Sequence, residues 1–173
     1  MNPLKKLASQ TAIYGLSSVV GRLLNYLLVP IYTRYFLPAE YGVVTELYAY
    51  VAFLVVLLTY GMETAFFRFS KKEETTKVYS TTLISLLISS VVFVGLIFLN
   101  SSEISRWLGY ANHPEYLQFF ALIIGMDAVA SISFAKLREQ DKAMRFAFIR
   151  IVNIMINIGL NLYFIVYQEY GIA

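Results

Sequence analysis

Charged and amide side chains stand inside long apolar stretches of this sequence, where they could bind ions or polar groups. Arg22, Asp127 and Asn157 each lie about ten residues into such a stretch, which at about 1.5 Å per residue is roughly 15 Å from its start. A charge at the centre of a membrane-spanning helix costs about 2.5–3.5 kcal/mol even on a mild insertion scale. We therefore expect Arg22 and Asp127 to face other helices or water rather than lipid.

A second polar pattern is a ladder of amides near the end of the chain. Asn153, Asn157 and Asn161 follow one another at intervals of four, so they share one side of a helix. In the first apolar stretch, a rotation of about 100° per residue places Asn25 on the same face as Arg22. These amides either hydrogen-bond between helices or line a passage for a polar substrate.

Two interpretations of the charged residues remain open at this point. Arg22 and Asp127 can form a buried ion pair that holds two helices in register, or they can line a hydrated passage. The two can also coexist. Glu46 lies near one end of its apolar stretch, where water is easier to reach, so it is a weaker signal than Asp127.

Catalytic signatures are missing from the sequence. It has no cysteine and a single histidine, His113, which argues against thiolate or imidazole metal sites. It also lacks a Gly-rich phosphate loop, a nucleophile elbow and an HExxH motif. We expect a protein that is not an enzyme and that needs no metal or cofactor.

The composition indicates which elements hold these residues. Hydrophobic residues make up 58% of the 173 residues and charged residues only 14%, which departs from the averages of soluble domains. Five apolar runs are each near the ~20 residues that a helix needs to cross a bilayer. We predict an all-α, polytopic membrane helix bundle, a single domain over residues 1–173, with spans at Ala12 to Phe36, Val43 to Phe67, Tyr79 to Leu99, Tyr116 to Lys136 and Phe148 to Gln168.

Basic residues collect in alternate gaps between the runs. One side holds eleven of them, in the gaps or near the ends of the runs, against only Arg34 and Arg106 on the other. Cytoplasmic loops are enriched in Lys and Arg, so the pattern predicts a cytoplasmic amino terminus and makes nucleic acid an improbable partner. The eleven are Lys5, Lys6, Arg68, Lys71, Lys72, Lys77, Lys136, Arg138, Lys142, Arg145 and Arg150.

Two segments carry a family resemblance. They are GRLLNYLLVPIYTRYFLPAEYG, Gly21 to Gly42, and GMETAFFRFS, Gly61 to Ser70. The chain resembles the amino-terminal part of the polysaccharide transporter branch of the MOP/MATE exporter superfamily, which includes O-antigen flippases. The resemblance implies that the chain forms most of the first helix bundle of a transporter with about twelve to fourteen helices. It also implies that this transporter lies in a bacterial or archaeal cytoplasmic membrane.

The resemblance also implies a function. Such a transporter moves an undecaprenyl-pyrophosphate-linked oligosaccharide between leaflets by alternating access. By similarity, Arg22 contacts the pyrophosphate, Asn25 and the amide ladder contact sugar hydroxyls, and Asp127 or Glu46 binds a coupling proton or sodium ion or forms an ion pair. The expected partners are the lipid-linked oligosaccharide, the bilayer, a carboxyl-terminal half of the transporter, and glycan polymerase or glycosyltransferase machinery.

Two other functions remain in competition. One is a MATE-like multidrug exporter, whose cavity favours acidic groups; the cationic Arg22 argues against it. The other is an inactive membrane fragment that acts only through helix packing, because the chain holds five predicted spans where the family has more.

Overall fold

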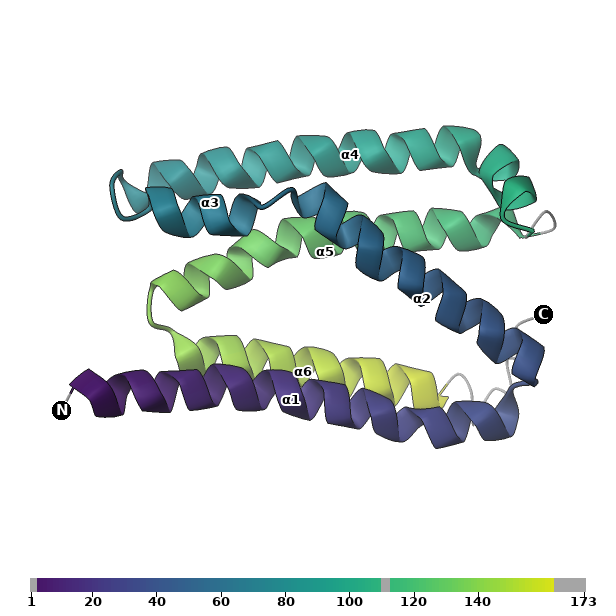
Figure 1. The fold of residues 1–173 in the computed structure, drawn as a ribbon, viewed down its shortest axis with the longest axis horizontal. Coiled ribbons are helices and arrows are strands. Elements are labelled where there is room, and N and C mark those ends of the chain that lie inside the picture. Colours follow the sequence, from purple (N-terminus) through teal and green to yellow (C-terminus); the bar gives the residue numbers. More distant parts are fainter. Residues whose placement is uncertain (1–2, 110–112, 164–173) are drawn as a thin grey trace. The chain divides into compact units, whose positions relative to one another are not determined.

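The computed structural model describes residues 3–109 and 113–163. These residues form six α-helices, and the described ranges contain no strand, so the all-α prediction is confirmed. For residues 3–10, 17–18, 21–22, 25, 31 and 39–40 only the backbone is described. The helices are α1 Pro3–Tyr35, α2 Pro38–Thr59, α3 Met62–Phe69, α4 Thr75–Trp107, α5 Pro114–Glu139 and α6 Ala143–Leu162 (Figure 1).

Proline marks the start of three helices. Pro3, Pro38 and Pro114 are the first residues of α1, α2 and α5. The first helical position suits proline, because its N–H would have no partner there and its fixed φ already matches the helix. These prolines thus occupy helix positions where the missing N–H costs no backbone hydrogen bond.

Four helical segments of the described residues are long and apolar enough to cross a membrane. They are Tyr41–Phe69, Thr75–Trp107, Pro114–Glu139 and Ala143–Leu162, and each overlaps one of the predicted runs. The chain is therefore a multi-pass membrane protein. The predicted run from Ala12 to Phe36 is helical as far as Tyr35, where α1 ends. Its crossing of the membrane stays a prediction, and the end of the last run, after residue 163, lies outside the described residues.

The predicted run from Val43 to Phe67 is interrupted in the structure. Tyr60 and Gly61 both have left-handed φ values, 32° and 74°, and they separate α2 from α3. Glycine adopts this conformation without the steric penalty of a Cβ, whereas tyrosine does not. The Tyr60 hydroxyl is 2.7 Å from Oγ of Ser85 on α4, which holds the turn in place.

The described residues fall into two compact units. Within the described residues, the first unit comprises 3–46 with 137–163, and the second comprises 47–109 with 113–136. The single domain predicted from the sequence stays a prediction.

The second unit has a packed core where α3 lies against α4. Phe66, Leu86, Ile132 and Ala135 are each 0% exposed and form one cluster. Further along α5, Gly125 lets the helix approach α4, because a Cβ at this position would stand 3.0 Å from Cγ2 of Val94. Residues from three helices are thus held together by side-chain packing, which is the main source of helix association inside a membrane.

Candidate functional site

In the first unit, α1 and α6 lie side by side and run in the same direction (Figure 1). The rings of Tyr14 and Phe146 meet edge to face at 5.0 Å, with an interplanar angle of 84°. Phe146 is buried, as are Ile154 of α6 and Leu28 of α1. This contact fixes the register of the two helices that carry most of the predicted polar residues.

Counting along both helices from the Tyr14 and Phe146 contact shows which predicted residues share a level. Eleven residues further, the chain reaches Asn25 on α1 and Asn157 on α6. Eight residues further, it reaches Arg22 on α1 and the residue after Asn153 on α6. The backbones of Arg22 and Asn25 therefore lie level with the amide ladder, while their side chains lie outside the described residues.

The amide ladder of α6 has the geometry that its spacing predicts. Nδ2 of Asn161 donates to the backbone oxygen of Asn157 at 2.8 Å and to its Oδ1 at 3.1 Å. Asn153 and Asn157 are exposed, and Asn161 is half-buried. In the described part of the chain, Asn153 makes no hydrogen bond. Polar groups of the ladder thus remain available to another molecule.

The ladder lies on the side of α6 that borders α1. At about 100° per residue, Asn153, Asn157 and Asn161 fall within roughly 60° of Phe146 on the helical wheel. Phe146 contacts Tyr14 of α1. The amides therefore stand along the edge of the α1 and α6 contact rather than on the far side of the helix.

Two arginines flank Phe146, and the sequence counted both among the basic residues that indicate topology. The guanidinium carbons of Arg138 and Arg150 lie 5.9 Å and 5.8 Å from the centre of its ring. Cations over an aromatic face are attracted by the ring quadrupole. Arg150 is four residues after Phe146, so helical spacing alone could have indicated this pair. Arg138 lies before the turn that precedes α6, and its contact depends on that turn.

The two predicted acidic residues are both exposed. Asp127 lies on α5, in the second unit, and has no hydrogen bond or ion pair in the described part of the chain. It is seven residues after Phe120, so the two share a face, and the Phe120 ring meets Tyr48 of α2 at 5.7 Å. Glu46 lies on α2 and belongs to the first unit. The pairing of Asp127 with Arg22 stays a prediction.

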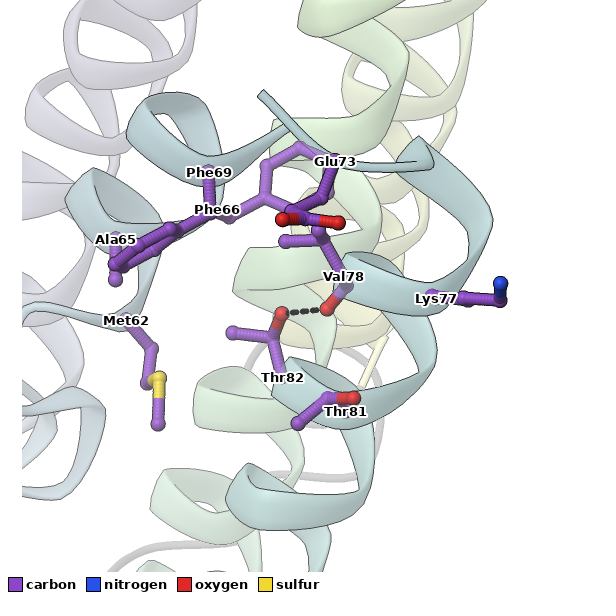
Figure 2. Close-up of a pocket in the computed structure, with 9 residues that line it drawn as sticks. All are labelled: Met62, Ala65, Phe66, Phe69, Glu73, Lys77, Val78, Thr81 and Thr82. Carbon is purple, nitrogen blue, oxygen red and sulfur yellow. Dashed lines mark hydrogen bonds between the residues drawn. The ribbon is translucent and has the colours of Figure 1, made fainter. Parts of the chain in front are cut away.

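A cavity between α3 and α4 holds none of the predicted residues. Its volume is about 390 Å³, and Figure 2 shows Lys77 extending away from it while Glu73 lies at its edge. The Lys77 ammonium pairs with Glu74 at 3.0 Å. The Thr82 hydroxyl donates to the backbone oxygen of Val78. The Lys77 charge and the Thr82 hydroxyl thus already have partners within the chain. This cavity is therefore a weaker candidate than the polar edge of α1 and α6.

Comparison with known protein families identifies the family of this chain. A family model described as Polysaccharide biosynthesis protein matches residues 31–172, which covers α2 to α6 and the end of α1. Comparison with the curated proteins and with the solved structures found no match. Because the match covers most of its length, this membrane protein, with its polar ladder on α6, belongs to the polysaccharide biosynthesis protein family.

Proposed function

We propose that the protein is a flippase that moves an oligosaccharide linked to undecaprenyl pyrophosphate from the inner to the outer leaflet by alternating access. The observation that carries the proposal is the exposed amide ladder of α6 beside α1, the helix that bears Arg22. Exposed amides inside a membrane span are costly unless they meet a polar partner. Membership of the polysaccharide biosynthesis family supports a glycan as that partner.

The proposed roles follow from the chemistry of each side chain. The Arg22 guanidinium binds the pyrophosphate, because its planar fork matches two phosphate oxygens at once. Asn25, Asn153, Asn157 and Asn161 exchange hydrogen bonds with sugar hydroxyls, since an amide both donates and accepts. Asp127 binds a coupling proton or sodium ion, or neutralises Arg22 when no substrate is bound. No covalent bond of the substrate changes, so the protein is a transporter and not an enzyme.

We place the protein in the cytoplasmic membrane of a bacterium or archaeon, with its amino terminus in the cytoplasm. The excess of basic residues in alternate gaps supports this orientation. The chain has no cysteine, so single cysteines can be labelled without background. A cysteine at Lys72 should resist an impermeant thiol reagent in intact cells, whereas one at Glu103 should react. The reverse pattern would invert the topology.

Replacement of Arg22 tests the function directly. The full chain is expressed in a strain without its own flippase, and polysaccharide on the cell surface is measured. We expect Arg22→Ala to abolish export and Arg22→Lys to retain a small part of it, because lysine keeps the charge but not the fork. Arg34→Ala is the matched control, since Arg34 is an exposed arginine near the end of the same helix.

The outcomes separate the proposal from its alternatives. Full export by Arg22→Ala would remove Arg22 as the phosphate contact, and rescue of its loss by Asp127→Ala would favour a structural ion pair. If the exposed carboxylate of Asp127 instead binds a cationic drug, the protein is a multidrug exporter. In that case drug resistance would depend on Asp127, whereas the amount of surface glycan would not depend on it. A wild-type chain that inserts normally but exports nothing would indicate a fragment that acts only by packing.

A further inference from the structure

One ammonium and two hydroxyl groups meet near the ends of α4 and α5, within the second unit. Nζ of Lys136 lies 3.8 Å from the centre of the Tyr79 ring, and the Tyr79 hydroxyl is 3.2 Å from Oγ of Ser133. Ser133 and Lys136 are three residues apart, so they share a face of α5. Sequence reasoning missed this cluster, because Tyr79 and Ser133 are 54 residues apart.

The cluster lies at a predicted boundary of the membrane. Tyr79 is the first residue of one predicted run and Lys136 the last residue of the next, and both face the side rich in basic residues. The sequence therefore places the cluster at the level of the lipid phosphates of the cytoplasmic leaflet.

Packing holds the cluster in one arrangement. The Tyr79 ring meets Phe66 edge to face at 6.4 Å, and Phe66 is fully buried against Leu86 and Ile132. Tyr79 is itself half-buried. A site whose side chains are fixed by a packed core loses less entropy when it binds a ligand.

The donors of the cluster exceed its acceptors. In the described part of the chain, no carboxylate pairs with Lys136, and the Tyr79 and Ser133 oxygens have no other hydrogen-bond partner. The ring accepts the ammonium through its face and leaves N–H groups free to donate. One of the two hydroxyls donates its proton to the other, so the second hydroxyl proton stays free to donate to a ligand. The cluster thus carries one positive charge and a surplus of donors.

We propose that Lys136, Tyr79 and Ser133 form a loading subsite for the phosphate of a lipid in the cytoplasmic leaflet. Phosphate oxygens are anionic acceptors, so they match a surplus of donors with one positive charge. The inference rests on the proposed function in one respect: the diphosphate of the lipid-linked glycan is the headgroup that binds here before it moves deeper into the membrane. The subsite is distinct from Arg22.

Binding by the full chain in phosphatidylcholine nanodiscs tests the proposal, with undecaprenyl diphosphate as the probe. We expect Lys136→Gln to weaken binding about tenfold or more, because it removes the charge. Lys136→Arg keeps both the charge and the ring contact, so it should bind within about threefold of wild type. Tyr79→Phe keeps the ring and removes only the hydroxyl, so the expected loss is about two- to fivefold.

Lys77→Gln is the matched control, because Lys77 lies on the same predicted side but already pairs with Glu74. It should change the affinity less than about twofold. Lys136→Gln that keeps wild-type helicity and wild-type affinity would overturn the subsite. An equal loss in Lys77→Gln would also overturn it, since that result indicates attraction to any basic residue.

Two further arms identify the source of the phosphate. Inorganic pyrophosphate that competes with the probe supports recognition of the diphosphate group itself. Phosphatidylglycerol that competes equally well would overturn the substrate assignment and leave a site for bulk phospholipid. Failure of the proposed function can be told apart from failure of the subsite. Full export by Arg22→Ala would refute the role of Arg22 but would leave any Lys136-dependent binding unchanged.

Discussion

The two units of the molecule differ in what they bury and what they expose. In the second unit, Phe66 and Leu86 are both 0% exposed, within a core built from α3, α4 and α5. In the first unit, α6 contacts α1 through Phe146 but leaves Asn153 and Asn157 exposed along the edge of that contact. The core of the second unit is thus organised around packing, whereas the contact between α1 and α6 keeps polar groups accessible along its edge.

This difference indicates that the packed core serves as a scaffold, whereas the ladder provides a polar surface. Exposed amides contribute little to helix association unless they find partners, so their placement on α6 is unfavourable for a structural helix. A close-packed core tolerates little change in volume. Substitutions in the packed core of the second unit should therefore act mainly on stability, and substitutions along the ladder should act mainly on export.

The largest effect on stability is expected from Phe66→Ala. The substitution leaves a cavity where the ring contacts the cluster, which costs about 3–5 kcal/mol for a buried phenylalanine. Titration of the purified chain with sodium dodecyl sulfate, followed by helical circular dichroism, measures the loss.

Phe69→Ala is the matched control on the same helix. Phe69 is 49% exposed, so its truncation should cost less than about 1 kcal/mol. Similar losses for the two phenylalanines would mean that α3 is not anchored through one face, and the contrast between the units would weaken.

One pair of glycines compares the units with the same substitution. A Cβ at Gly125 would meet Cγ2 of Val94 at 3.0 Å, whereas one at Gly159 of α6 would meet nothing within 4 Å. Valine has a single favoured rotamer in a helix and cannot easily move aside. Overpacking costs about 1–3 kcal/mol and outweighs the gain of about 1 kcal/mol in helix propensity.

We therefore expect Gly125→Ala to destabilise the protein by about 1 kcal/mol and Gly159→Ala to stabilise it by a similar amount. The same detergent titration measures both variants. If both substitutions stabilised the chain, α5 and α4 would not pack as closely at Gly125 as the structure indicates.

The sequence predicted the helices well because their signal is local. Apolar runs and basic gaps can be counted along the chain, and four of the runs coincide with helices of spanning length. The interruption at Tyr60 was not predictable in this way. Gly61 permits the turn, but the left-handed φ of Tyr60 is held by a hydroxyl contact with Ser85, 25 residues away.

The candidate site was predictable only in part, for the same reason. The spacing of Asn157 and Asn161 predicted a shared face, and the structure adds a hydrogen bond between them. The direction of that face became evident only from the Tyr14 and Phe146 contact, which joins distant segments. The cluster around Lys136 also depends on distant partners, and apolar periodicity carries no information about such pairs.

A smaller effect is expected from Tyr60→Phe, which removes the hydroxyl bonded to Ser85. A hydrogen bond of this kind contributes about 0.5–1.5 kcal/mol. A double-mutant cycle with Ser85→Ala isolates the interaction, because each single variant removes the same bond. We expect a coupling energy of about 1 kcal/mol from the detergent titration. Additive losses would mean that another contact holds the Tyr60 turn.

The smallest effect on stability is expected in the ladder itself. Asn161→Ala removes two contacts to Asn157 on an exposed helix surface, and alanine is the better helix former. The two effects nearly cancel, so the free energy of unfolding should change by less than about 0.5 kcal/mol. Surface polysaccharide should nevertheless fall, because the removed amide belongs to the proposed sugar contacts.

Asn153→Ala sharpens this last comparison, since Asn153 makes no hydrogen bond in the described part of the chain. Export that falls in both variants while stability stays constant is what a substrate-facing ladder requires. If Asn161→Ala alone lost export, and lost stability with it, the amides would act as helix contacts. The first unit would then be a scaffold like the second, and the polar surface for transport would have to lie elsewhere.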